Sequence, residues 1–131
     1  MLLDDIRSYL IAQGVVQSGT SIPLPPWPCF EGYVTDDQDQ TVALFETGGY
    51  PADTLGRENE RVTFQVRVRA ARLDYSTARA KWLAIFNALQ DSIPAPGYAF
   101  VQAMHYGPMH FNDDKGRPNL TANFRVMKAR S

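Results

Sequence analysis

The chain has 131 residues, with 13 Lys and Arg against 14 Asp and Glu, for a formal net charge of −1. We expect one domain over residues 1–131, and the near-neutral charge argues against a chain-wide basic surface for nucleic acid. No stretch reaches the roughly 20 apolar residues of a membrane-spanning helix, and charged residues interrupt the start MLLDDIRSYL where a signal peptide would be apolar. We therefore expect a soluble chain that is not secreted by that route and has no membrane partner.

The first thirty residues predict a helix followed by a crossover. Apolar residues at helical spacing indicate a short amphipathic helix over residues 2–13, which ends at Gly14. The stretch GTSIPLPPWPCF holds four prolines within six residues, and we interpret it as extended connecting chain on the surface. A ligand for proline-recognising modules is the alternative interpretation of this stretch.

Two short strands, CFEGYV and TVALFE, are predicted on either side of the acidic turn TDDQDQ. Asp36, Asp37 and Asp39 lie in this turn, where a calcium site is one hypothesis. An EF-hand loop, however, also needs a glycine at its sixth position, a glutamate at its twelfth and flanking helices. The spacing therefore favours a solvated turn.

The clearest strand signal runs from Val62 to Ala70. Apolar and polar residues alternate strictly there: Val62, Phe64, Val66 and Val68 against Thr63, Gln65, Arg67 and Arg69. One face of this strand should be core, and the other should meet solvent or an interface. The next segment, DYSTARAKWLAIFNALQ, has apolar residues at helical steps, which predicts a helix capped by Asp74 or Ser76.

The C-terminal third predicts two more strands. Large side chains alternate from Tyr98 to Tyr106, and apolar residues alternate from Leu120 to Met127. We expect these segments to pair as a long hairpin across GPMHFNDDKGRPN. The predicted fold class is α+β: a mainly antiparallel sheet of about four to five strands, with two helices packed on one face.

Groups suited to catalysis or metal binding are few. His105 and His110 would lie on opposite faces of a strand, which disfavours joint ligation of a metal. The stretch TGGYPADTLG lacks the lysine followed by Ser or Thr of a phosphate-binding P-loop. The single Cys29 is interpreted as a small hydrophobe. We therefore predict no enzyme activity, no catalytic residue, no metal site and no cofactor.

Arginines concentrate in the middle of the chain and return in its last strand. Arg57, Arg61, Arg67, Arg69 and Arg72 lie within sixteen residues, and Arg125, Lys128 and Arg130 follow later. If Arg67, Arg69 and Arg125 share the outer sheet face, they form a basic stripe. Three interpretations remain open: a solvated face, an interface with an acidic surface of another subunit, or a surface that contacts phosphates.

Several segments resemble a known family. VALFETGGYPAD, RENERVTFQVRVRA, YSTARAKWLAIFNALQ and DDKGRPNLTANFRV, in this order, resemble the minor capsid and tail-terminator proteins of long-tailed bacteriophages. The resemblance extends from DDIRSYLIAQGV to the final strand. It implies a structural virion protein of α+β fold, located in the tail at the head–tail junction and assembled in the bacterial cytoplasm.

The resemblance also implies partners. Proteins of this kind form a hexameric ring that caps the tail tube, stops tail polymerisation and presents a docking surface to the neck of the DNA-filled head. The implied partners are further copies of the chain, the tail tube protein and a head-completion or neck protein, with DNA passing through the ring without sequence-specific binding. Arginines of one subunit can then meet Asp36, Asp37 and Asp39 of the next.

Two alternatives to this function stay open, and a long polar connection suggests where assembly contacts lie. The alternatives are a head-to-tail connector or other minor capsid or neck protein, and a small nucleic-acid-binding domain. The stretch from Thr47 to Arg61 lacks evident secondary structure, and such a loop is usually functional or disordered. With the hairpin tip 112–119, it gives these expected assembly residues: Thr47, Gly48, Gly49, Tyr50, Asp53, Arg57, Glu58, Arg61, Arg67, Arg69, Asp113, Asp114 and Arg117.

Overall fold

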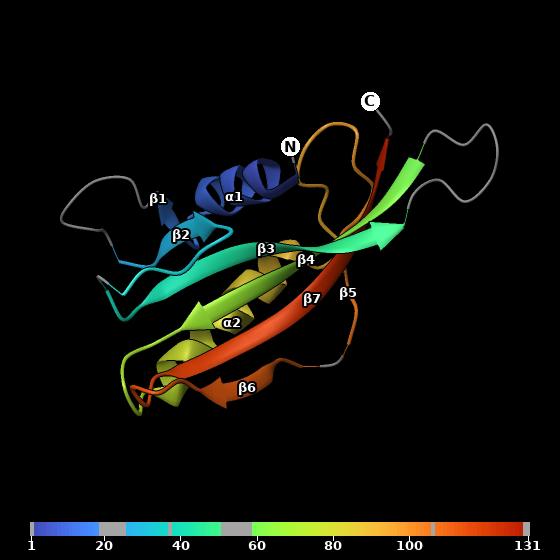
Figure 1. Cartoon of the computed structure of the whole chain (residues 1–131). Helices are drawn as coiled ribbons and strands as arrows, with labels where there is room; N and C mark the ends of the chain where they lie inside the picture. The colour runs from blue at the N-terminus through green and yellow to red at the C-terminus, as the bar shows by residue number, and fades with distance from the viewer. Residues whose placement is uncertain (1, 19–25, 37, 51–58, 106, 130–131) are drawn as a thin grey trace.

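The computed structural model of the chain describes residues 2–18, 26–36, 38–50, 59–105 and 107–129. These residues form two helices and a mixed sheet of seven strands, with both helices on one face of the sheet (Figure 1). The helices are α1 (Leu2–Ala12) and α2 (Tyr75–Leu89). The strands are β1 (Gln17–Ser18), β2 (Pro28–Glu31), β3 (Thr41–Tyr50), β4 (Asn59–Arg69), β5 (Gln102–Ala103), β6 (Met109–Asn112) and β7 (Pro118–Ala129). The predicted α+β class is confirmed, although the sheet has more strands than expected.

Three long strands, in the order β3, β4 and β7, form the middle of the sheet (Figure 1). β4 pairs antiparallel with β3 on one side and, over its full length, with β7 on the other. β5 and β6 both pair antiparallel with β7, whereas β1 and β2 add in parallel on the β3 side. β2 and β3 run in the same direction because the chain between them returns to the end of the sheet where β2 begins.

The alternation predicted for β4 is confirmed in its two faces. Phe64, Val66 and Val68 have no exposed surface and face the helices. The register places the polar residues of β4 on the opposite face, which neither α1 nor α2 covers. We call this second surface the open face.

The two helices close the core on the other side of the sheet. Ile6 and Leu10 of α1 are fully buried at the spacing of one helical turn. The Tyr9 hydroxyl donates a hydrogen bond of 2.9 Å to the main-chain oxygen of Ala88 in α2, which ties the helices together. α1 ends as predicted, because Gly14 adopts a φ of +76° that favours glycine.

α2 begins and ends close to its predicted bounds. Asp74 caps it: its carboxylate accepts a hydrogen bond of 3.3 Å from the Thr77 amide. The buried residues of the helix are Ala78, Trp82, Ile85 and Leu89. Tyr75 and Leu83, two of the apolar residues at helical steps in this segment, are exposed, because only a narrow stripe of the helix meets the sheet.

The strand predicted from Tyr98 to Tyr106 is confirmed only in part. The segment runs antiparallel to β7, with a bridge between Tyr98 and Lys128 and the pairing of β5, but it is no continuous strand, and Tyr106 lies outside the described residues. Only the two residues of β5 pair with β7 as strand, while Val101 exchanges main-chain hydrogen bonds of 2.8 Å with Asp91 and Ser92. Gly97, with a φ of +91°, turns the chain back toward the end of α2. The hairpin partner of β7 is instead β6, which lies in the segment expected to be the connecting tip.

Candidate assembly surface

The predicted assembly loop begins later than its sequence suggests. β3 extends to Tyr50, and β4 begins at Asn59. The pairing with β4 shifts register between Glu46 and Gly49, and Gly48 has a φ of +95° within this shift. Thr47 and Gly48, predicted to lie in a loop, therefore form a β-bulge opposite Thr63, and Gly49 pairs with Val62 in the continuing strand.

Other members of the predicted set occupy several environments. Asp53, Arg57 and Glu58 lie outside the described residues, so their place in an assembly surface stays a prediction. The Thr47 hydroxyl lies 2.9 Å from that of Thr63, a hydrogen bond that joins β3 to β4 beside the bulge. Asp114 is exposed in the turn between β6 and β7.

Arg69 and Arg117 hold the loop of residues 32–40 against the sheet. Each is only 5% exposed. The Arg69 guanidinium donates to three main-chain oxygens of that loop, at 2.5 to 3.1 Å. The Arg117 guanidinium contacts three carboxylates, which belong to Asp36 at 2.8 Å, Asp39 at 3.4 Å and Asp113 at 2.8 Å. We call these five residues the loop network.

The loop network changes the expected contacts between subunits. Asp36 and Asp39 already have an arginine partner in their own chain, so the structure does not support their predicted pairing across a subunit boundary. Asp37 lies outside the described residues. The solvated turn is confirmed in part: Asp36 is 65% exposed, yet its carboxylate holds the loop in place.

Arg117 also alters the protonation of two carboxyls. Its hydrogen bond, followed by the positive charge of Lys115, lowers the pKa of Asp36. Burial alone would raise the pKa of Asp113, but hydrogen bonds from the Arg117 amide and guanidinium outweigh burial and lower it. Both groups therefore stay ionised to a lower pH than a free aspartate.

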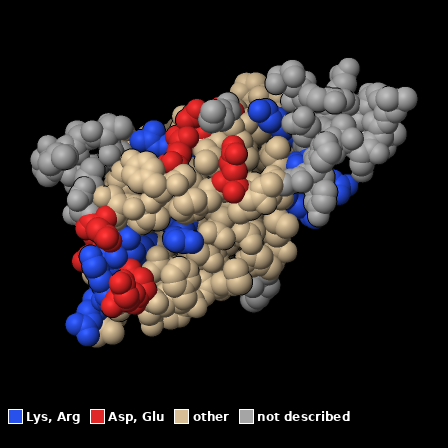
Figure 2. Space-filling model, in the orientation of Figure 1, with Lys and Arg blue, Asp and Glu red and all other residues tan. Residues whose placement is uncertain are grey.

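The strand register places the three arginines of the predicted basic stripe on one face, but their side chains do not form a continuous charged surface. Arg67, Arg69 and Arg125 do share the open face, as expected. The Arg67 guanidinium carbon lies 5.2 Å from the ring centre of Phe45 and 5.5 Å from that of Phe111. Arg69 is buried in the loop network, and only Arg125 of the three is exposed. Figure 2 accordingly shows a largely uncharged surface across the middle of the open face.

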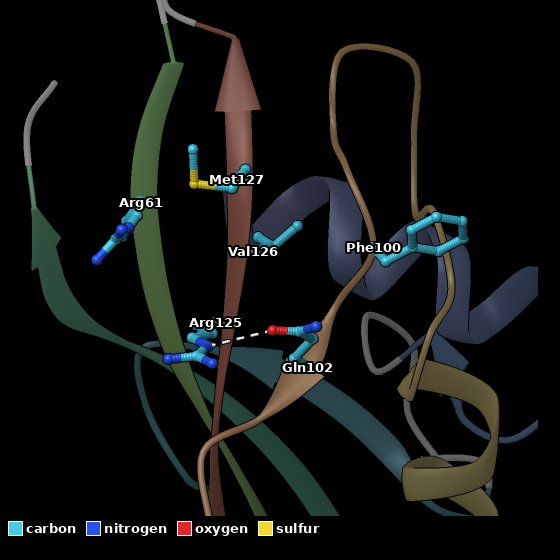
Figure 3. Close-up of a pocket in the computed structure, with 6 residues that line it drawn as sticks. All are labelled: Arg61, Phe100, Gln102, Arg125, Val126 and Met127. Carbon is cyan, nitrogen blue, oxygen red and sulfur yellow. Dashed lines mark hydrogen bonds between the residues drawn. The ribbon is translucent and has the colours of Figure 1, made fainter.

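An open cavity of about 270 Å³ lies where β4 and β7 approach the segment before β5 (Figure 3). Its lining residues are Arg61, Phe100, Gln102, Arg125, Val126 and Met127. The Arg125 Nε donates a long hydrogen bond of 3.4 Å to the Gln102 side-chain oxygen. Phe100 lines the cavity from the segment before β5, and its ring is 57% exposed and points away from the two arginines (Figure 3). Two cationic side chains and an accessible aromatic ring suit contact with an acidic protein surface.

The histidines and the cysteine have structural roles. The His105 Nδ1 lies 3.0 Å from the Gly107 oxygen, and its Nε2 accepts a hydrogen bond of 3.2 Å from the Asn123 amide. Burial raises the pKa of Cys29 to about 12, which keeps the thiol protonated and unreactive. Within the described part of the chain, no three His, Cys, Asp or Glu side chains could hold a metal ion, and no helix is long and apolar enough to cross a membrane.

Of the six residues that line the cavity, the sequence placed only Arg61 in the predicted assembly set. Arg125 was noted only as part of a stripe. Phe100 and Gln102 were assigned to a long strand, because their alternation fits a strand pattern. The prolines at positions 94 and 96 just before them were the available signal that regular pairing would fail.

The chain matches one family of known proteins in sequence and a solved structure in fold. Residues 9–129 match the family described as "Bacteriophage tail terminator protein". Among solved structures, a chain in the "Virion of native gene transfer agent (GTA) particle" has a TM-score of 0.70 at 14% identity, over 95% of this chain and 91% of that one. That identity shows a shared fold only, and no curated protein matches. Because the family match spans almost the whole sequence, the chain belongs to the bacteriophage tail terminator family, as a structural protein of the virion tail and not an enzyme.

Proposed function

We propose that this protein forms the ring that caps the finished tail tube, stops tube polymerisation and provides the surface on which the head or neck docks. The family match over residues 9–129 carries this proposal. Its neighbours in the particle would be further copies of itself, the tail tube protein and a head-completion or neck protein. The DNA would pass through the ring without sequence-specific contacts.

The surface of the domain supports an assembly role. Several large apolar side chains are at least 40% exposed on different elements: Tyr33, Leu73, Tyr75, Leu83, Ile93, Phe100, Met104, Met109 and Phe111. Exposed aromatic and methionine side chains are enriched in protein interfaces relative to the remaining surface. All four side chains of β6 are exposed, and this strand lies at an edge of the sheet. An edge strand offers main-chain groups to another chain.

The mass of the particle in solution tests the ring. We expect native mass spectrometry to find six times the monomer mass, either for the protein alone or only after purified tail tubes are added. Binding to tubes is included because a ring can require its template before it closes. A protein that stays monomeric in both conditions but binds capsids would contradict the proposal and indicate a connector on the head side.

A further inference from the structure

We propose that the arginine-lined cavity of one copy receives the acidic edge formed by Asp4 and Glu31 of the next copy. The cavity is the one lined by Arg61 and Arg125 beside Phe100. The inference rests on the proposed ring and names the contact that would repeat around it. The partner it commits to is a second copy of this chain.

The arginines of the open face differ in whether their side chains can bind a partner. Arg69 and Arg117 are buried in the loop network, and Arg67 lies between two phenylalanine rings. Arg61 and Arg125, in contrast, are exposed, and the ion pairs shown for the described residues involve neither of them. Figure 3 shows Arg61 on β4 and Arg125 on β7, the two strands beside the cavity. Within the described residues no carboxylate pairs with either arginine, so both can bind carboxylates of another chain, while Arg125 also donates its long hydrogen bond to Gln102.

The acidic edge is formed by one residue of α1 and one of β2. Asp4 lies in the first turn of α1 and is exposed, and Glu31 ends β2 at intermediate exposure. The 2.9 Å hydrogen bond from Arg7 of α1 to the Cys29 oxygen of β2 holds the helix against this strand, one turn from Asp4 and two residues from Glu31. Burial, followed by a hydrogen bond with Asp4, raises the pKa of Glu31. Arg7 offsets part of this charge, but its guanidinium is already bound to the Cys29 oxygen and the Ser18 hydroxyl. A cation from another chain would relieve the remaining repulsion.

The acidic edge and the cavity lie on different strands and on opposite faces of the sheet. In the strand order β1-β2-β3-β4-β7-β5, the acidic edge belongs to β2 and the cavity to β4, β7 and β5. The register also puts Glu31 on the helix side of the sheet and Arg125 on the open face. In Figure 2, acidic side chains gather over the α1–β2 region and basic ones toward the ends of β4 and β7.

Different patches that face different ways favour a head-to-tail contact. A contact between two unlike surfaces leaves each copy with one free cavity and one free acidic edge. The contact therefore repeats until the rotation closes the ring, whereas a contact between like patches would stop at a dimer. Exposed charge pairs of this kind also guide subunits together and are weakened by salt.

Two charge-reversed variants test this contact. The first, Arg61→Glu/Arg125→Glu, makes the cavity acidic, and the second, Asp4→Lys/Glu31→Lys, makes the edge basic. Each alone sets like charges against each other, and we expect its assembled fraction, with tubes where the wild type needs them, to fall about tenfold or more. Mixed in equal amounts, the two should assemble again in alternation, with equal numbers of both in each particle by native mass spectrometry.

The controls separate this inference from the ring itself. Asp91→Asn removes an exposed acid just after α2, outside both proposed surfaces and at a φ of +61° that asparagine tolerates, and should assemble like the wild type. If the wild type assembles but the mixture does not recover, or if either variant assembles normally alone, the contact is wrong while the ring stands. A wild type that never assembles overturns both. If a reversed variant fails to fold by circular dichroism, Arg61→Gln/Arg125→Gln replaces it, and unchanged assembly of that variant overturns the contact.

Discussion

Replacing Phe124 with alanine is expected to lower the free energy of unfolding by about 3–5 kcal/mol. Phe124 lies in β7 with no exposed surface, stacked on Phe64 of β4 at 5.5 Å between ring centres. Its ring also lies 6.3 Å from that of Phe86, so it joins the sheet to α2. The loss is a large fraction of the roughly 5–15 kcal/mol that stabilises a typical domain.

Urea unfolding followed by circular dichroism measures this loss. The matched control is Phe100→Ala, which removes the same side chain from an exposed position and should change stability by less than about 1 kcal/mol. Equal losses for the two variants would mean that the ring of Phe124 is not a central part of the core.

Replacing Arg117 with methionine is expected to cost about 2–3 kcal/mol of stability. Methionine keeps an unbranched chain in a buried position but removes the guanidinium and its hydrogen bonds to the three carboxylates of the loop network. The main-chain amide of residue 117 still donates to Asp113. Asp113 would then be left only 19% exposed without its cation. The loop of residues 32–40 would lose one of its two arginine anchors.

Lys115→Met is the control for charge without burial. Lys115 also pairs with Asp36, at 3.7 Å, but is 57% exposed. Exposed ion pairs contribute about 0–1 kcal/mol, so its loss should be small. Equal stability losses for Arg117→Met and Lys115→Met in thermal unfolding would show that burial of Arg117 gives the network no extra strength.

The same network makes stability depend on pH. The pKa of Asp36 and of Asp113 is lower in the folded chain than the ordinary value of 3.8. Their contribution is therefore fully present above that value and is lost as the pH falls through the lower folded values. Stability of the wild type should decline below about pH 4, and Arg117→Met should show a smaller decline in this window because its carboxyls have lost the cation that lowered their pKa.

The parts of the fold that sequence predicted correctly are those fixed by local patterns. The alternation from Val62 to Ala70 fits only a strand with one buried face. The spacing of apolar residues after Asp74 fits only a helix with one buried stripe. Both signals repeat over many residues, so a single misread position does not change them. For these two elements, tertiary packing decided only which residues at the border of the buried face are exposed, such as Leu83.

The prediction of a continuous strand from Tyr98 to Tyr106 was wrong because an alternating pattern does not determine which segment forms main-chain hydrogen bonds with it. The chain there had a competing partner in the segment after α2, and Val101 pairs with residues of that segment instead of β7. β6 has only four residues, so the alternation of Met109 and Phe111 with two polar residues is too short to predict a strand. Pairing choices of this kind depend on the whole sheet.

The candidate assembly surface was predictable in composition but not in arrangement. The abundance of arginines was visible, yet their division into buried, stacked and exposed members depends on residues far away in sequence. Arg117, for example, meets Asp36 across 81 positions. Only the folded chain therefore shows that Arg61 and Arg125 are exposed beside one cavity.

Growth of tail tubes in the presence of this protein tests the terminator function most directly. Purified tail tube protein would be allowed to polymerise with and without the chain, and tube lengths would be measured by electron microscopy. We predict that added protein stops elongation and leaves a ring at one end of each tube. Tubes that continue to grow at the same rate with the protein present, and that carry no ring, would contradict the proposed function.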